Sequence, residues 1–403
     1  MKLIKKIVLP LLICLFYSCQ EKKAETKKEE SVMEKAEKQF SLLVVEAEKA
    51  NRIPRTINKD GEMHWAKERF DWTEGFFPGS CWYLFEATGN KKWQMAAEKF
   101  QAQFESHKHL TTNHDLGFVF NCSYGNGFRL TKNEAFKEVM ITASNSLLTR
   151  FNPNVGCIKS WDVTGGWQKE RGWMFPVIVD NMMNLELLFE ASKLTGDSKY
   201  KEAAITHANT TIKNHFRENN SSFHVVDYNP ETGEVRHKQT AQGFSHDSSW
   251  ARGQAWGLYG YTVCYRYTKD KKYLEQAQKI ANYILNFKGT PEDGIPYWDY
   301  NAEHIPNEPR DVSAATITAS ALIELDKYSK ENYKGAIDKI LNTLATKEYT
   351  AALGENHNFL LKHSVGSIPH NNEIDVPLNY ADYYYFEALL RYKNEYKTES
   401  NEE

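Results

Sequence analysis

The chain has 403 residues and a formal net charge of −3 at pH 7, and no stripe of lysine and arginine runs along it. Nucleic-acid-binding domains carry a basic patch, so these values argue against nucleic acid as a partner. Hydrophobic residues make up 41% of the chain and aromatic residues 13%, enough for a large core, and no linker rich in proline, glycine and serine divides it.

The first nineteen residues have the order of a bacterial lipoprotein signal. A lysine-bearing start is followed by an apolar run over 7–17 and then by Ser18 and Cys19. In such a signal the peptide is cut before the cysteine, so Cys19 becomes the lipidated N-terminus. Plain secretion is the alternative, and the apolar run is too short to span a bilayer. Residues 20–35 are charged and lack aromatic side chains, which predicts a solvated tether.

This interpretation places the protein in the bacterial cell envelope. A lipid anchor would hold it to the inner or outer membrane, facing the periplasm or the cell surface. A soluble periplasmic protein is the alternative. Residues 36–397 would then form the folded domain.

Amphipathic helices follow one another along the chain. Two short stretches look like strands, 223–228 and 295–298, and both are bounded by turn residues. Twelve segments have the apolar spacing that predicts helices, namely 32–50, 75–88, 91–108, 115–130, 133–151, 173–195, 198–216, 248–267, 271–287, 311–328, 332–348 and 378–395.

A short phrase recurs between these helices. A glycine or lysine that can end one helix precedes an Asn or Asp that can cap the next, and an aromatic residue that can pack back follows. The predicted αα-hairpin turns are Thr88–Trp93, Thr131–Phe136, Thr195–Tyr200, Thr268–Tyr273 and a shortened copy, Ser329–Tyr333. Six helix pairs without a domain break predict an all-α fold, the (α/α)6 barrel, with inner helices around a central pocket. An open helical solenoid is the alternative.

The cysteines indicate neither a metal site nor a disulfide framework. Six cysteines reduce to four once Cys14 and Cys19 are assigned to the signal, and none of the four has CxxC spacing. We expect buried thiols at Cys81, Cys122, Cys157 and Cys264.

Two aspartates stand in segments dense with polar chemistry. Asp115 follows His114 at the start of a predicted helix, where the helix dipole alone would favour an acid. Asp180 lies among the apolar residues of 177–188, where an ionised carboxylate is costly unless it is paired or protonated. Either could be structural. Together, on inner helices beside a tryptophan-rich lining, they favour a carboxyl pair for acid/base work on sugars.

The segment Gly243–Gly257, GFSHDSSWARGQAWG, has the highest density of polar and aromatic side chains suited to a binding site. Its residues Ser245, Asp247 and Ser248 all suit a helix N-cap. A helix that starts there places Arg252 and Trp256 at positions i and i+4, on one face. A guanidinium beside an indole can hold an anionic sugar. The structural alternative is a buried aromatic helix whose arginine pairs with an acid.

Tryptophans gather in the same parts of the chain. Most tryptophans in a helical barrel are core residues, and stacking on a sugar ring is the functional alternative. The candidates are Trp72, Trp161, Trp250 and Trp256.

Seven motifs, in order, resemble glycoside hydrolase family 88, the unsaturated glucuronyl hydrolases. The resemblance covers roughly residues 35–395 and implies an (α/α)6 barrel without a metal or organic cofactor. It also implies removal of the 4,5-unsaturated uronic acid that polysaccharide lyases leave at a non-reducing end. The motifs are WTEGFFPG, HDLGF, VDNMMNLELL, SSWARGQAWG, PYWDY, RDVSAATITASALIEL and YADYYYFEALLRY.

The resemblance also implies roles for individual residues. Asp180 matches the family's general acid/base, and Asp115 matches its second essential aspartate. Trp161 is the choice for the stacking tryptophan between them, with Trp167 and Trp173 as alternatives. The implied substrate contacts are His114, Trp72, Trp161, His224, Gln242, Arg252 and Trp256.

The implied chemistry is hydration of the enol ether. A protonated Asp180 gives its proton to C4, positive charge develops at C5 and the ring oxygen, and water adds at C5. The resulting hemiketal opens and the glycosidic bond breaks. An ionised Asp115 nearby would raise the pKa of Asp180 and stabilise the cation.

Other functions and several substrates remain open at this level. The unsaturated rhamnogalacturonyl hydrolases share the implied barrel and chemistry. A non-catalytic glycan-binding lipoprotein and a polysaccharide lyase are the rivals from other classes. The polymer could be a glycosaminoglycan or the algal polysaccharide ulvan, and thus sulfated. Ser364 and Ser367 could contact a sulfate, or belong to a plain loop.

Overall fold

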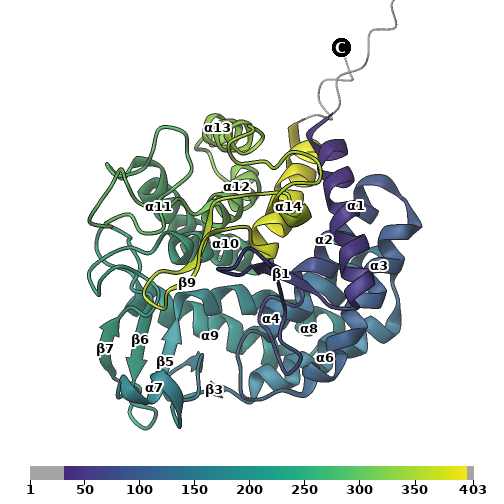
Figure 1. The fold of residues 1–403 in the computed structure, drawn as a ribbon. Coiled ribbons are helices and arrows are strands. Elements are labelled where there is room, and N and C mark those ends of the chain that lie inside the picture. Colours follow the sequence, from purple (N-terminus) through teal and green to yellow (C-terminus); the bar gives the residue numbers. More distant parts are fainter. Residues whose placement is uncertain (1–30, 397–403) are drawn as a thin grey trace, which may run out of the picture. The chain divides into compact units, whose positions relative to one another are not determined.

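Helices alternate between an inner and an outer ring in the computed structural model, which describes residues 31–396 (Figure 1). The predicted signal and Cys19 lie outside the described residues, as does most of the tether. The outer helices are α1 (Val32–Ala50), α3 (Lys91–Gln101), α6 (Glu134–Leu148), α9 (Ser198–His215), α11 (Lys271–Asn286) and α13 (Lys334–Leu344). The inner helices are α2 (Phe76–Thr88), α4 (Leu116–Phe120) with α5 (Asn126–Thr131), α8 (Leu185–Thr195), α10 (Ala251–Thr268), α12 (Val312–Asp326) and α14 (Asn379–Tyr396).

The inner helices form a closed ring. Helix α12 packs against α10 on one side and α14 on the other, and α14 packs against α2. Two inner helices are buried nearly all round: α10 is buried from Ala251 to Cys264, and in α12 every side chain from Val312 to Leu325 is buried. A helix that is apolar on all faces belongs in an interior. The closed ring confirms the (α/α)6 barrel and rules out the open solenoid.

Four of the five predicted turns are confirmed. The shortened copy Ser329–Tyr333 joins α12 to α13, but α12 ends in the right-handed residue Lys327, and the side chain of Tyr333 does not cap α13. The side chains of Asn90, Asn133, Asp197 and Asp270 each accept a hydrogen bond from the backbone N–H two residues on, and each caps the outer helix that follows. Such a cap satisfies one of the free N–H groups at a helix start. Each preceding inner helix ends in a left-handed residue, at Gly89, Lys132, Gly196 and Lys269.

Three predicted helices differ in the structure. The segment 91–108 is α-helical only to Gln101 and continues as the 3₁₀ turn η1 (Ala102–His109). The segment 115–130 is broken, because the π-helical turn η2 (Asn121–Gly125) separates α4 from α5. The segment 173–195 begins as strand β5 (Phe175–Ile178) and the 3₁₀ turn η3 (Val179–Asn184) before α8 starts. Pro176 and three β-branched residues after it favour an extended chain over a helix.

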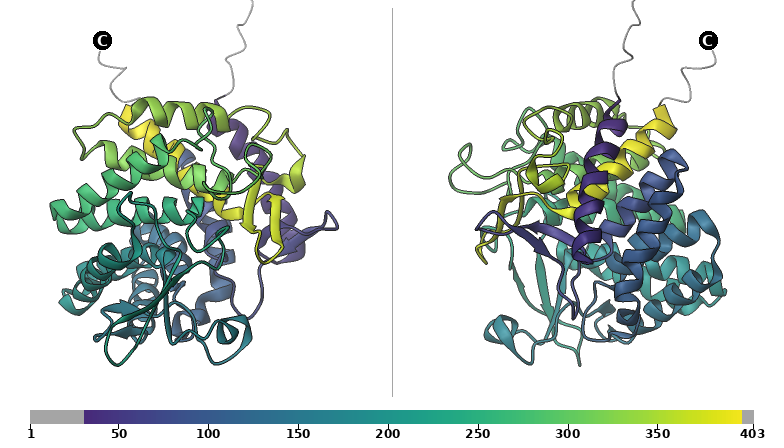
Figure 2. Two further views of the ribbon diagram at one scale, coloured as in Figure 1. Left: turned by 90° about the vertical axis from the view of Figure 1, so that its left-hand side faces the viewer. Right: turned by 45° about the vertical axis from the view of Figure 1, so that its right-hand side comes forward.

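Short strands cover one end of the ring (Figure 2). The prediction of a strand over 223–228 is confirmed by β6 (Val225–Tyr228), whereas 295–298 forms only an isolated bridge at Tyr297. Strand β6 pairs with β5 and with β7 (Val235–Gln239), and the others form two-stranded hairpins. The remaining strands are β1 (Pro54–Ile57), β2 (Met63–Trp65), β3 (Phe151–Asn152), β4 (Cys157–Ile158), β8 (Ser364–Ser367) and β9 (Asn372–Val376). The short helical turns are η1 (Ala102–His109), α7 (Gly166–Glu170) and η4 (Asn356–Asn358).

Two further features concern the cysteines, which are as predicted from the sequence, and the length and polarity of the helices. Cys81, Cys122, Cys157 and Cys264 are free and buried, as expected. Within residues 31–396, no helix is long and apolar enough to cross a membrane.

Candidate active site

The predicted aspartates share one mouth of the barrel. Asp115 directly precedes α4, Asp180 lies in η3 just before α8, and Arg252 stands in the first turn of α10. All three positions are at the N-terminal ends of inner helices, and the helices of this ring run in the same direction. The structure thus brings together segments that lie up to 137 residues apart, from Asp115 to Arg252.

Asp180 is a buried acid with one close polar neighbour. It is 8% exposed, and its Oδ2 lies 3.6 Å from Nε2 of His224. Burial raises the pKa of Asp180 to about 7, although the positive charge of Arg252 opposes this effect. A carboxyl group in this range can both hold and release a proton near neutral pH.

Asp115 is the second acid of the pair. Its Oδ1 lies 3.3 Å from Nε2 of the fully buried His114. Burial and then the negative charge of Asp180 raise the pKa of Asp115 to about 8. The expectation that Asp115 is the ionised partner is therefore not met in this structure. The two carboxyls interact, so the proton belongs to the pair rather than to Asp180 alone.

His224 is held in one tautomer. Its Nδ1 accepts hydrogen bonds from the backbone N–H groups of Ala241 and Gln242, both at 3.1 Å. Burial lowers the pKa of His224 well below its usual value, and the positive charge of Arg252 adds to this. The neutral ring therefore carries its proton on Nε2, the nitrogen that faces Asp180. This agrees with the predicted place of His224 in the site.

Arg252 has its own acid partner. It is 1% exposed, and Nη1 lies 2.8 Å from Oδ2 of Asp311, the N-cap residue of α12. The guanidinium also donates to the carbonyl oxygens of Val365 and Gly366 in β8. The structural alternative, an arginine paired with an acid, is thus what the structure shows. A contact between Arg252 and a substrate carboxylate stays a prediction.

Helix α10 starts later than predicted. It begins at Ala251, and no side chain caps it, so the predicted caps Ser245, Asp247 and Ser248 are wrong. The Oγ of Ser248 instead donates to Asp299, and the backbone N–H of Ala251 donates to the carbonyl of Trp298.

Trp256 and Trp72 frame the floor of this mouth. Trp256 does lie one turn after Arg252, but it is 1% exposed and packs edge-on against Phe118 and Tyr384. Trp72 is half-buried and packs against Phe118 and Tyr380. Part of the Trp72 ring is therefore exposed, whereas the Trp256 ring is enclosed by the core. Substrate contact by either ring stays a prediction.

Three tryptophans form one cluster beside His224. The rings of Trp161 and Trp173 stack at 5.7 Å, and Trp167 meets both edge-on. Trp173 is buried, whereas Trp161 and Trp167 are half-buried. Trp161 also lies 5.9 Å from the His224 ring, which places it nearer to Asp180. The geometry favours Trp161 and Trp167 over Trp173 as stacking surfaces.

The hairpin β8–β9 belongs to the site, and only its serines were considered from the sequence. The side-chain amide of Gln242 donates to the carbonyl oxygen of Gly366 at 3.3 Å, as Arg252 does. Ser364 is fully buried and Ser367 bonds to His370, so the suggested sulfate contact of Ser364 is wrong in this structure. Strands this short and irregular leave no alternating pattern in the sequence.

Asn181 and Asn184 were missed from the sequence as polar members of the site. Both are fully buried in η3, between Asp180 and α8. Two asparagines among apolar residues, three positions apart and just after a candidate acid, were the available signal. Buried amides need hydrogen-bond partners, which in this place can only come from neighbouring site segments.

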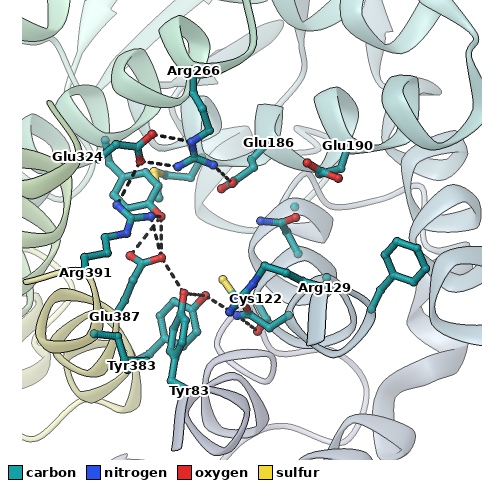
Figure 3. A pocket seen from close by; sticks show the side chains of 18 of the residues that line it. Tyr83, Cys122, Arg129, Glu186, Glu190, Arg266, Glu324, Tyr383, Glu387 and Arg391 are labelled. Carbon is teal, nitrogen blue, oxygen red and sulfur yellow. Dashed lines mark hydrogen bonds and ion pairs between the residues drawn. The ribbon is translucent and has the colours of Figure 1, made fainter. Parts of the chain in front are cut away.

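The opposite mouth holds a separate cavity of about 840 Å³. Most of its lining residues lie toward the C-terminal ends of the inner helices, but Gly117 and Phe118 at the start of α4 and Met183 in η3 also line it; neither Asp115 nor Asp180 does. Figure 3 shows Arg266 between Glu324 and Glu186, and Arg391 beside Glu387. These charges neutralise one another, so this cavity is not the best candidate for the catalytic site. Within residues 31–396, no group of three or more His, Cys, Asp or Glu could hold a metal ion.

Comparison with known proteins identifies the family. The model of Glycosyl Hydrolase Family 88 matches residues 45–262. The unsaturated glucuronyl hydrolase of Formosa agariphila is 42% identical over 399 residues, which cover 98% of each chain. The chain belongs to glycoside hydrolase family 88. It is therefore a glycosidase.

Solved structures agree with this family 88 assignment. The crystal structure of an unsaturated glucuronyl hydrolase specific for heparin is 44% identical, with a TM-score of 0.85 over 90% of this chain and 97% of that chain. A variant of the Streptococcus agalactiae unsaturated glucuronyl hydrolase, complexed with dGlcA-GalNAc6S, is 30% identical with a TM-score of 0.76 and covers 90% of both chains. The barrel and its order of motifs are thus those of family 88.

Proposed function

We propose that this family 88 enzyme removes the 4,5-unsaturated glucuronic acid from the non-reducing end of oligosaccharides by hydrating the C4=C5 double bond. The observation that carries the proposal is the carboxyl pair at the barrel mouth. Burial raises the pKa of Asp180 to about 7 and, with the charge of Asp180, that of Asp115 to about 8. At least one of the two carboxyls then keeps its proton near neutral pH. The enol ether needs such a protonated group as its proton donor.

The proposed step conserves atoms and charge. The protonated carboxyl of Asp180 gives its proton to C4, and the electron pair of the double bond forms the new C–H bond. The positive charge that develops at C5 and the ring oxygen is stabilised by the carboxylate left behind. Water adds at C5 and returns a proton to the same carboxylate. The hemiketal then opens, and the glycosidic oxygen leaves with the second sugar.

The neighbouring side chains support the proposed role of Asp180. The Nε2 of His224 carries the ring proton, because the other ring nitrogen accepts two backbone hydrogen bonds. This Nε2–H group lies 3.6 Å from Oδ2 of Asp180, too far for a hydrogen bond in this structure but close enough to form one after a small shift. Such an N–H group stabilises the carboxylate after proton transfer without itself giving up a proton. The half-buried faces of Trp72, Trp161 and Trp167 are the surfaces open to sugar rings.

The proposed substrates are unsaturated glycosaminoglycan or ulvan fragments, including sulfated ones. Two similar structures are of an enzyme specific for heparin and of a complex with dGlcA-GalNAc6S. Arg171 supports an acidic second sugar, because it is exposed beside Trp173, donates to the carbonyl oxygen of Thr240 at 3.5 Å and forms no ion pair with a described acid. An uncompensated guanidinium is a good partner for sulfate.

The proposed location is the cell envelope, with the chain anchored through lipid on Cys19. The order of the first nineteen residues supports this. A Cys19→Ser variant expressed in a Gram-negative host should move from the membrane fraction to the soluble fraction and lose incorporation of labelled palmitate. Membrane attachment of this variant that equals the wild type would refute the anchor.

Absorbance of the conjugated enol tests the proposed reaction against its rivals. Mixing the protein with unsaturated chondroitin, heparin, hyaluronan or ulvan disaccharides should abolish the ultraviolet absorbance of at least one of them. A glycan-binding lipoprotein would leave the absorbance unchanged, and a polysaccharide lyase acting on intact polymer would raise it. Loss with an unsaturated rhamnogalacturonan disaccharide alone would favour the unsaturated rhamnogalacturonyl hydrolases.

A further inference from the structure

Two buried asparagines connect the segments that carry the two aspartates. The Oδ1 of Asn184 accepts a hydrogen bond from the backbone N–H of Phe118, in α4. Its Nδ2 lies 3.2 Å from Oδ1 of Asn181 and 3.3 Å from Nδ1 of His114. The Nδ2 of Asn181 in turn donates to the carbonyl oxygen of Ile158. The chain of amides thus begins and ends on backbone groups.

These backbone groups determine where every proton in the chain lies. A backbone N–H can only donate, so the atom of Asn184 that meets Phe118 is its oxygen. A carbonyl oxygen can only accept, so the atom of Asn181 that meets Ile158 is its nitrogen. It follows that Asn184 Nδ2 is a donor to both of its neighbours. His114 must therefore accept on Nδ1.

The tautomer of His114 follows from this. Burial lowers the pKa of His114 to about 3, so the ring is neutral at physiological pH. With Nδ1 unprotonated, the proton sits on Nε2, which lies 3.3 Å from Oδ1 of Asp115. Asp115 and Asp180 thus each have the Nε2 of a neutral histidine nearby, at 3.3 and 3.6 Å, although neither Nε2 forms a hydrogen bond among the described residues. Different hydrogen bonds fix the two tautomers.

Close packing keeps Asn184 in register with the start of α4. A Cβ added to Gly117 would lie 2.3 Å from Cα of Asn184, so only glycine allows this approach. Gly117 is two residues after Asp115, and Asn184 is four residues after Asp180. A single amide side chain therefore links the positions of both carboxyls.

We propose that Asn184 is a positioning residue that holds His114 in its Nε2–H tautomer against Asp115 and ties the Asp115 helix start to the Asp180 turn. The inference rests on the proposed roles of the two aspartates. Titratable groups also act on this pair from other elements. Arg150 and His207 act on His114, and Asp180, Arg150 and Asp71 act on Asp115.

The tautomer can be measured without substrate. In the wild-type enzyme labelled with ¹⁵N-histidine, the His114 resonances, assigned by their loss in a His114→Gln variant, should show an unprotonated Nδ1 and a protonated Nε2 at pH 7. A protonated Nδ1, or a doubly protonated ring, would overturn the proposal. This result does not depend on turnover, so it separates the tautomer from the proposed reaction.

Two variants test the consequence for catalysis. Asn184→Asp replaces the donor with an acceptor, so His114 should move its proton to Nδ1 and leave a lone pair facing Asp115. We expect kcat to fall by about tenfold or more with little change in KM, and the alkaline limb of the pH profile to shift upward. Asn184→Leu removes the donor without adding charge and should give mixed tautomers in the same spectrum.

A matched substitution at the opposite mouth serves as the control. Asn126 is also a buried asparagine of the inner ring, whose Nδ2 donates to the carbonyl oxygen of Cys122. Asn126→Asp should leave the pH profile of kcat and the His114 resonances unchanged. Should Asn184→Asp lower only thermal stability, with the pH profile and the tautomer as in the wild type, Asn184 is structural and the proposal is wrong.

Discussion

At the scale of single residues, the site depends on burying acids without giving them full charge partners. Asp180 is 8% exposed, and its Oδ2 has no hydrogen bond within the described protein. Asp382 is fully buried and accepts two backbone N–H groups, from Leu360 and Leu361, yet burial raises its pKa to about 7 as well, so burial is the main cause in both acids. An unpaired buried carboxylate is costly, so Asp180 retains its proton more readily than a surface acid does.

The pH dependence of the reaction follows from these shifts. The pKa of Asp180 is raised to about 7 and that of Asp115 to about 8, so the pair gives up its proton as the pH rises through this range. Because the reaction needs that proton, kcat/KM should fall above about pH 8, by tenfold per pH unit for one lost proton. A profile from pH 5 to 10 measures this. A kcat/KM that keeps rising to pH 9 would contradict the proton-donor role.

At the scale of elements, each of the four capped hairpin turns ends one helix and starts the next through local contacts. A left-handed residue ends the inner helix, and an Asn or Asp caps the outer helix two residues before the N–H that it satisfies. The same arrangement at four turns fixes where four outer helices begin, independently of the core. The turns therefore contribute to the barrel's stability but have no part in the chemistry.

Removal of the caps should lower stability additively. Asp197→Ala and Asp270→Ala each remove a side-chain cap, and each should lower the unfolding free energy. The loss in the double variant should equal the sum of the two single losses, since the two turns share no partner. Urea unfolding measures this, with Lys279→Ala on the exposed face of α11 as the control. A loss no greater than that of the control would refute the capping role.

The elements also show how far the sequence could predict the structure. Apolar spacing located the uniform helices such as α11 closely, because burial on one face leaves a clear period. The same spacing misled at β5, since a short run buried on both faces reads alike as strand and helix. The aspartates and His224 were predicted through motifs. The partners of Arg252 were not, because Asp311 and β8 lie 59 and about 113 residues away.

At the scale of the whole molecule, two mouths of one barrel have different tasks. The mouth at the helix N-termini holds the carboxyl pair, and the opposite mouth holds a network of arginines and acids (Figure 3). In that network Glu387 accepts from Tyr83, Tyr259, Ser320 and Arg391, so it connects four inner helices. The network closes the ring at the end opposite the described strands.

A single substitution in this network should destabilise the fold and spare the chemistry. Glu387→Gln leaves the half-buried Arg391 with a weaker partner and removes a charge from the buried Glu387, and should cost about 3 kcal/mol of unfolding free energy. Because Glu387 is outside the catalytic mouth, kcat at 25 °C should change by less than about twofold. Glu86→Gln, which breaks a more exposed pair with Arg129, should cost at most about 1 kcal/mol. Equal stability of the Glu387→Gln variant and the wild type would contradict this.

The most direct test of the account is the Asp180→Asn variant, assayed by loss of the enol absorbance of an unsaturated disaccharide. The amide cannot supply the proton, so kcat should fall by about 100-fold or more while the disaccharide still binds. Since the pKa of Asp180 is raised on folding, its stabilising effect is lost as the pH rises from about 4 through 7. The variant should therefore unfold at a temperature at least as high as the wild type at pH 8. Turnover by a folded Asp180→Asn variant at the wild-type rate would show that the proton comes from elsewhere.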